Sequence, residues 1–207
     1  MIENRKNEHL HLCKDNRFDL RNQLNHPFDQ FYFEYDALPE IDANEIDLSV
    51  NFLGNKLSAP ILIGAMTGGT PEADRINAIL LEAANETGIP FSYGSQRIAI
   101  ENNHNVQSFK QHLNFNDIPF IFGNLGAVQL NYGLSTKLIN QFCNETNIDG
   151  LFLHLNPLQE IIQDEGNHNF KDLLSKINDL TTTLNIPIFI KEVGAGMDPA
   201  SARRLAA

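Results

Sequence analysis

Side chains that could bind or transform a ligand gather in five short segments, each of which follows an apolar run. Arg97 and Lys191 are cations that can bind an anion, while Ser95 and Asn124 can donate and accept hydrogen bonds. Each segment alone also fits a simple turn, because glycines serve turns and polar residues often follow strands. Together they predict one binding site if the fold brings them to one place. The segments are residues 65–69, 94–97, 123–126, 154–160 and 191–196.

The apolar runs before these segments predict five strands. They have strand length and begin roughly 30 to 36 residues apart, and four of them start at or right after a proline, which suits a strand entry. The runs are residues 60–63, 90–93, 119–122, 151–153 and 187–190. Helical patterns separate them: they open at Thr70, Ser135 and Asp198, cover residues 170–184, and are weaker over residues 106–113.

This alternation predicts an α/β fold with a buried parallel sheet, in a barrel or a doubly wound layer. A closed (β/α)8 barrel needs about 250 residues. We therefore expect one partial TIM-barrel domain over residues 1–207, with about five of the eight strands in this chain. Residues 1–57 form an extension and a hairpin that turns at Gly54-Asn55 and plugs one end, and residues 58–207 form β/α units one to five.

Composition excludes several classes of protein. The chain is 42% hydrophobic and 20% charged, and it has no apolar run near the roughly 20 residues of a membrane span, which predicts a cytoplasmic globular protein without a membrane partner. The net charge of -11 argues against nucleic acid as a partner. Cys13 and Cys143 lack the spacing of a disulfide framework or a metal site, so we interpret them as buried or incidental thiols.

Six motifs in order from Arg5 to Gly196 resemble type 2 isopentenyl diphosphate isomerase, and this chain is similar to its N-terminal part. The motifs are RKNEH, APILIGAMTGG, GSQR, GNLGA, HLNPLQE and KEVGAG. The resemblance implies a (β/α)8 barrel that binds flavin mononucleotide (FMN), a divalent cation, usually Mg²⁺, and a flavin that NADPH commonly reduces. It also implies a homo-oligomer, a tetramer or an octamer, that interconverts isopentenyl diphosphate and dimethylallyl diphosphate.

The resemblance also implies roles for particular residues. Flavin contacts fall on Ala65, Met66, Thr67, Ser95, Asn124 and Lys191. Substrate contacts fall on Arg5, Lys6, His9, Ser95, Gln96, Arg97, Asn156 and Gln159, the metal position is Glu160, and Gln159 and His154 are the catalytic candidates. Without the resemblance, Arg5 and Lys6 are solvated charges and Glu160 is a carboxylate in a first helical turn.

The implied reaction is a redox-neutral shift of a double bond, in which the reduced flavin serves as acid and base. Gln159 positions the alkene or relays a proton, and His154 helps to orient the ligands. Two rivals stay open at this stage. One is another FMN-dependent TIM-barrel oxidoreductase, such as a 2-hydroxy acid oxidase, and the other is an inactive truncated half-barrel.

Overall fold

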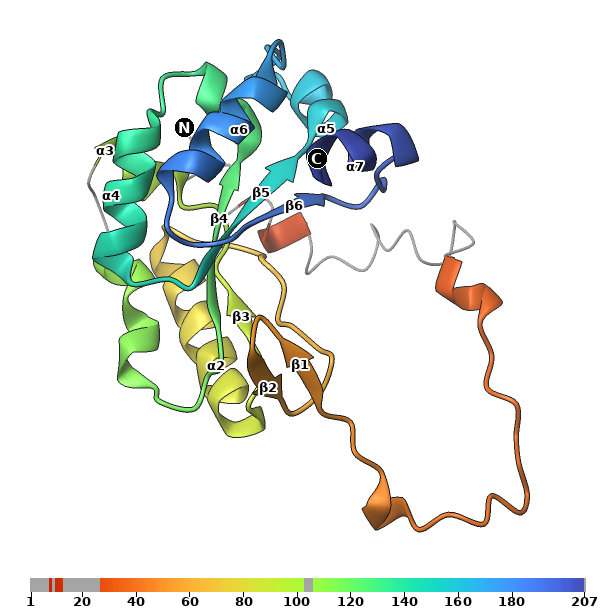
Figure 1. The fold of residues 1–207 in the computed structure, drawn as a ribbon. Coiled ribbons are helices and arrows are strands. Elements are labelled where there is room, and N and C mark those ends of the chain that lie inside the picture. The colour runs from red at the N-terminus through yellow and green to blue at the C-terminus, as the bar shows by residue number, and fades with distance from the viewer. Residues whose placement is uncertain (1–7, 9, 13–26, 103–105, 207) are drawn as a thin grey trace.

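The computed structural model describes residues 8, 10–12, 27–102 and 106–206. Within these residues lie a two-stranded hairpin and a four-stranded sheet flanked by helices (Figure 1). The strands are β1 (Val50–Phe52), β2 (Asn55–Leu57), β3 (Phe91–Ser92), β4 (Ile121–Gly126), β5 (Gly150–Leu155) and β6 (Ile188–Glu192). The helices are η3 (Pro27–Gln30), η4 (Ala43–Glu45), α2 (Pro71–Thr87), α3 (Arg97–Asn102), η5 (Val106–Phe109), η6 (Gln111–Asn114), η7 (Ala127–Asn131), α4 (Thr136–Thr146), α5 (Pro157–Ile162), α6 (Leu173–Thr183) and α7 (Pro199–Ala206).

The main sheet is parallel and curled, with the strand order β3-β4-β5-β6. Four of the five expected strands form in the described part of the chain. The expected strand at residues 60–63 is reduced to one bridge between Ile63 and Phe91. In this bridge the Ile63 N–H donates to the Pro90 carbonyl, and the Ser92 N–H donates to the Ile63 carbonyl. The described residues therefore form a curled half-barrel sheet of four strands, while a closed eight-stranded barrel is not confirmed.

Three predicted helices, α2, α4 and α6, cover the outer face of the sheet, and α2 and α4 begin at the capping residues that the sequence predicts. The Thr70 hydroxyl accepts from the Ala73 N–H at 3.2 Å, Gly88 ends α2 at φ +64°, and the Ser135 hydroxyl accepts from the Leu138 N–H at 3.3 Å. Leu and Ile side chains of α2, α4 and α6 pack with the outward residues of the strands in one large core. The weak pattern at residues 106–113 forms the short 3-10 helices η5 and η6.

The hairpin packs through aromatic rings against the inner face of the sheet, which is the face opposite α2, α4 and α6. The Phe52 ring lies 5.6 Å from that of Phe120 and 6.0 Å from that of Phe189, and Phe122 and Phe152 complete the layer. The register pairs Phe52 with Asn55, so the turn residues are Leu53 and Gly54, at φ +48° and +81°. The predicted turn at Gly54-Asn55 is therefore one residue late, and the hairpin covers the inner face near the amino ends of the strands.

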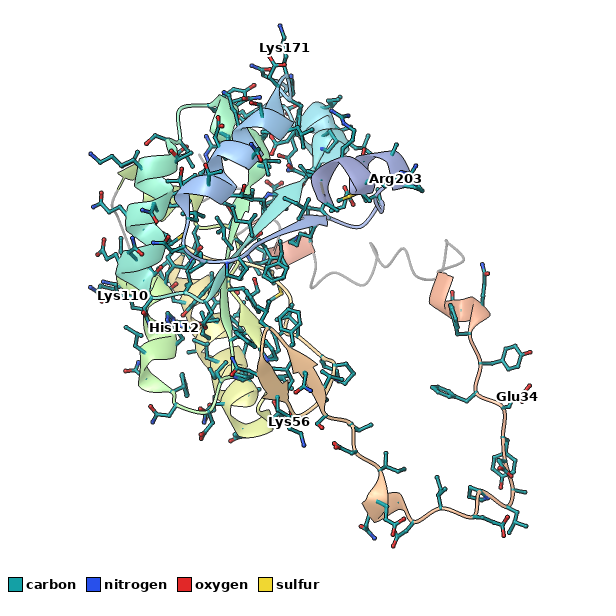
Figure 2. The ribbon with its side chains drawn as sticks, in the orientation of Figure 1. Glu34, Lys56, Lys110, His112, Lys171 and Arg203 are labelled. Atoms are coloured by element: carbon teal, nitrogen blue, oxygen red, sulfur yellow. The ribbon has the colours of Figure 1, made fainter. Side chains whose placement is uncertain are left out.

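Residues 31–48 run away from the body of the molecule with their side chains exposed, as Glu34 illustrates in Figure 2. None of the helices in the described part of the chain has the length and apolarity that a membrane crossing demands. Cys143 is buried in the outer core, and burial raises the pKa of its thiol to about 12, which keeps it protonated. Cys13 lies outside the described residues.

Candidate active site

A layer of polar side chains lies on the inner face of the sheet, toward the carboxyl ends of the strands. In β4, Phe122 belongs to the inner aromatic layer, and side chains alternate between faces, so Asn124 points the same way one step further along. His154 follows Phe152 in β5 and Lys191 follows Phe189 in β6 by the same spacing. Asn124, His154 and Lys191 thus form one polar layer above the phenylalanines.

The imidazole of His154 is held between two of its neighbours. Its Nδ1 lies 3.2 Å from Oδ1 of Asn124, and His154 is the register partner of Lys191. Burial, and then the charge of Lys191, lower the pKa of His154 to about 4, while Glu160 opposes the shift. Burial also lowers the pKa of Lys191, and Glu192 offsets part of that change. His154 is therefore a neutral imidazole near pH 7.

The polar layer forms the floor of a cavity of about 270 Å³. That volume is close to the lower end of the roughly 300–1,000 Å³ found for ligand sites. Eleven of the residues predicted from the sequence line it together: Ala65, Met66, Thr67, Ser95, Arg97, Asn124, His154, Asn156, Gln159, Glu160 and Lys191. The loops after β3, β4, β5 and β6 and the loop after Ile63 thus meet at one place, as the sequence predicts.

A hydrogen-bonded cluster at the start of α5 forms one wall. The Asn156 amide donates to Oε1 of Gln159 at 3.1 Å and to Oε1 of Glu160 at 2.9 Å. The other Glu160 oxygen accepts from the N–H of Asn167. A Cβ at Gly166 would stand 1.7 Å from the carbonyl oxygen of Glu160, so only glycine lets this loop close over the carboxylate. The Glu160 side chain is thereby buried with a fixed orientation.

The opposite wall comes from the loops around Thr67 and Arg97. The Thr67 carbonyl accepts from the N–H of Gly94 at 3.1 Å and from the Asn77 amide at 3.3 Å. A Cβ at Gly94 would stand 2.3 Å from the Thr67 backbone, so a glycine is needed there. Arg97 forms an ion pair with Glu101 through its Nε, at 2.7 Å. That pair fixes the side chain of the cation at the cavity.

Four predicted contacts are not among the described residues that line the cavity. Arg5, Lys6 and His9 lie outside the described residues. Gln96 is fully buried, and its side chain accepts a hydrogen bond from the N–H of Asn124. The described residues contain no group of three or more His, Cys, Asp and Glu that could hold a metal ion.

Three of the residues that line the cavity lie outside the five segments predicted from the sequence: Leu10, Gln129 and Gln163. Gln129 is 4% exposed, and its Oε1 is buried without a hydrogen-bond partner in the described structure. It lies five positions after Asn124, and η7 turns the chain back so that both residues reach the cavity. Its role depends on the turn of η7, which no pattern in the sequence marked.

The curled parallel sheet defines an α/β protein, and the polar cavity at the carboxyl ends of its strands is a candidate ligand site. No protein-family model matches the chain. Curated proteins named isopentenyl-diphosphate delta-isomerase are similar to it: those of Nostoc sp. and Oceanobacillus iheyensis are each 42% identical, over 99% of this chain and 58% of their own length. The one from Rickettsia prowazekii is 40% identical, over 97% of this chain and 58% of its own length. The chain thus spans somewhat more than half the length of these relatives.

Proposed function

We propose that this chain belongs to a flavin-dependent, type 2 isopentenyl-diphosphate delta-isomerase, and that the cavity above the polar layer is its active site. The observation that carries the proposal is the convergence of Asn124, His154 and Lys191 with the Thr67 and Arg97 loops on one cavity. The names of the relatives suggest isopentenyl and dimethylallyl diphosphate as the substrate pair. Because the chain spans only part of those relatives, we propose the activity for the whole protein that contains it.

The residues of the cavity fit flavin mononucleotide as its cofactor. Oε1 of Gln129 and Oδ1 of Asn156 are buried acceptors without a partner in the described structure, and a flavin ring offers N–H donors where a diphosphate offers none. Lys191 can place a positive charge near the ring, which stabilises its anionic reduced form. Bound and reduced, with NADPH as the proposed reductant, the ring would supply the acid and base of the reaction. Asn124 and Lys191 are the residues that would hold it.

The diphosphate needs cations and hydrogen-bond donors, and Arg97 is the described side chain best suited to it. Its guanidinium can bind phosphate oxygens in pairs, and the bond to Glu101 limits its motion. Glu160 supports the same end, since a carboxylate together with diphosphate oxygens and water can complete the coordination of Mg²⁺. The described residues would then contribute one carboxylate to that metal.

His154 and Gln159 are proposed to orient the reacting alkene. His154 is neutral, so it attracts the diphosphate weakly but can hold a fixed hydrogen bond. Gln159 cannot act as a general acid of useful strength, and its Oε1 is already bonded to the Asn156 amide. These two side chains therefore position the substrate, and the protons come from elsewhere in the cavity.

A flavin titration tests the cofactor assignment. We expect FMN fluorescence to be quenched on binding to the wild type, and Lys191→Ala to raise the dissociation constant about tenfold to a hundredfold, because a charge-assisted contact is worth roughly 1.5–3 kcal/mol. Lys110→Ala is the matched control, because Lys110 pairs with Glu145 on the outside of the molecule. No binding to the wild type, or equal binding by all three proteins, would refute the assignment.

The metal assignment has its own test. Glu160→Gln keeps the size of the side chain and its acceptor for Asn167 but removes the charge. We expect this variant to need a higher Mg²⁺ concentration for half-maximal isomerisation. A Mg²⁺ dependence identical to that of the wild type would count against a role for Glu160 in metal binding.

A further inference from the structure

Gln96 lies on the outer side of β4, away from the cavity. A Cβ placed on Gly123 would meet Oε1 of Gln96 at 2.5 Å, together with side chains of Ile148 and Leu151 that belong to the outer core. Gly123 therefore leaves room for the Gln96 side chain on the face that α4 and α6 cover. Asn124, the next residue, points to the other face. Gln96 is 0% exposed and is not among the residues that line the cavity, and its Nε2 has no hydrogen-bond partner in the described structure.

In this position Gln96 joins two elements that line the cavity. Its N–H donates to the Asn124 carbonyl at 2.9 Å, and its side-chain Oε1 accepts from the Asn124 N–H at 3.1 Å. Its own carbonyl accepts from the N–H groups of Ala99 and Ile100. These two bonds close the first turn of α3, which begins at Arg97. One residue thus fixes both backbone groups of Asn124 and the first turn that carries Arg97.

The held residue, Asn124, in turn sets the His154 ring. Its Oδ1 lies 3.2 Å from Nδ1 of His154, and an oxygen acceptor there requires the proton on Nδ1. The lone pair of the neutral ring is then on Nε2. This nitrogen lies beside Gly126, 3.1 Å from where a Cβ on that residue would stand, and both residues line the cavity. The orientation of the Asn124 amide thus decides which nitrogen of His154 carries the proton.

We propose that Gln96 is a positioning residue that aligns the Asn124 amide with His154, and that it does not contact the diphosphate. The proposal rests on the proposed function only for its effect on the reaction. The alignment itself is a property of the free protein. It departs from the substrate contact that the family resemblance implies for Gln96.

The first test needs no ligand. Gln96→Met removes the acceptor at nearly constant size, and NMR of the ¹⁵N-labelled imidazoles reports the tautomer and pKa of His154. We expect Gln96→Met to change both in the same direction as Asn124→Leu, and the double variant to match Asn124→Leu alone. Gln141→Met, an exposed change on α4, is the control and should change nothing. An unaltered His154 in Gln96→Met, or fully additive effects in the double variant, would overturn the proposal.

The second test separates positioning from contact. In a positioning role, Gln96→Met lowers kcat about tenfold to a hundredfold, since a misplacement of about 1 Å can cost this much, and leaves KM for isopentenyl diphosphate within about twofold. Gln96→Glu keeps the acceptor and should restore part of the loss. In a contact role, a carboxylate would repel the diphosphate, so Gln96→Glu would raise KM more than Gln96→Met does. That order of KM values would disprove the proposal even if the isomerase activity is confirmed.

Discussion

His154 and Lys191 are register partners on the neighbouring parallel strands β5 and β6. The neutral imidazole of His154 therefore lies beside the charged ammonium group of Lys191. The Lys191 charge is the second cause, after burial, of the low pKa of His154. The two groups are coupled: a change at Lys191 must appear in the titration of His154. The coupling can be measured in the protein without any ligand.

We expect Lys191→Met to raise the pKa of His154 from about 4, although burial should keep it below the ordinary value. The measurement is an NMR titration of the imidazole ring between acid and neutral pH. Lys110→Met removes a lysine outside the cavity, which Figure 2 places on the helical side of the molecule, and should leave His154 unchanged. A shift of equal size in both variants would mean that Lys191 exerts no local effect.

The buried His154 should also make stability depend on pH. The pKa of His154 is about 4 in the folded chain and about 6.5 in the unfolded chain. Between these two pH values the unfolded chain binds more protons, so the free energy of unfolding falls as pH drops from about 6.5 toward 4. At roughly 1.36 kcal/mol per pKa unit, the whole loss is about 3 kcal/mol. Urea unfolding across this range should show a shallower acid decline for His154→Asn than for the wild type. Parallel curves for the variant and the wild type would contradict the assignment.

The hairpin turn offers a stabilising change. Leu53 and Gly54 both have positive φ, a turn for which Asn-Gly is the preferred pair, whereas a leucine in this region is strained. Leu53→Asn should therefore raise the free energy of unfolding by about 0.5–1 kcal/mol. Leu53→Ala keeps the unfavourable backbone conformation and should give no such gain. Equal stability of the Asn and Ala variants in urea unfolding would argue against strain at this turn.

The loop over Glu160 should tolerate no side chain at Gly166. Gly166→Ala places a Cβ against the Glu160 carbonyl, so the loop must shift, at an expected cost of about 1–3 kcal/mol in unfolding free energy. Gly64→Ala is the control, because a Cβ there meets nothing within 4 Å. If both alanine variants unfold at the urea concentration of the wild type, the loop at Gly166 does not approach the Glu160 backbone as closely as described.

The sequence predicted the alternation of elements and the contents of the cavity well, for physical reasons. Prolines and capping residues such as Thr70 and Ser135 act locally, and the carboxyl ends of parallel strands must lie at one edge, which brings together segments distant in the chain. The role of Gln96 could not be predicted, because it depends on a gap left by Gly123 on the neighbouring strand. Gln129 escaped for a similar reason, since only the turn of η7 directs it back to the cavity.

The most direct test of the account is isomerisation itself, followed by NMR of the substrate, in the protein that carries this chain. Isopentenyl diphosphate is incubated without oxygen with Mg²⁺ and with oxidised or reduced FMN, using the wild type and Asn124→Leu. We expect dimethylallyl diphosphate to form only with the wild type and reduced flavin, and Asn124→Leu to remain folded but lose most of the rate. Conversion without flavin, or none under any condition, would contradict the proposed function, and full activity in Asn124→Leu would place the active site elsewhere.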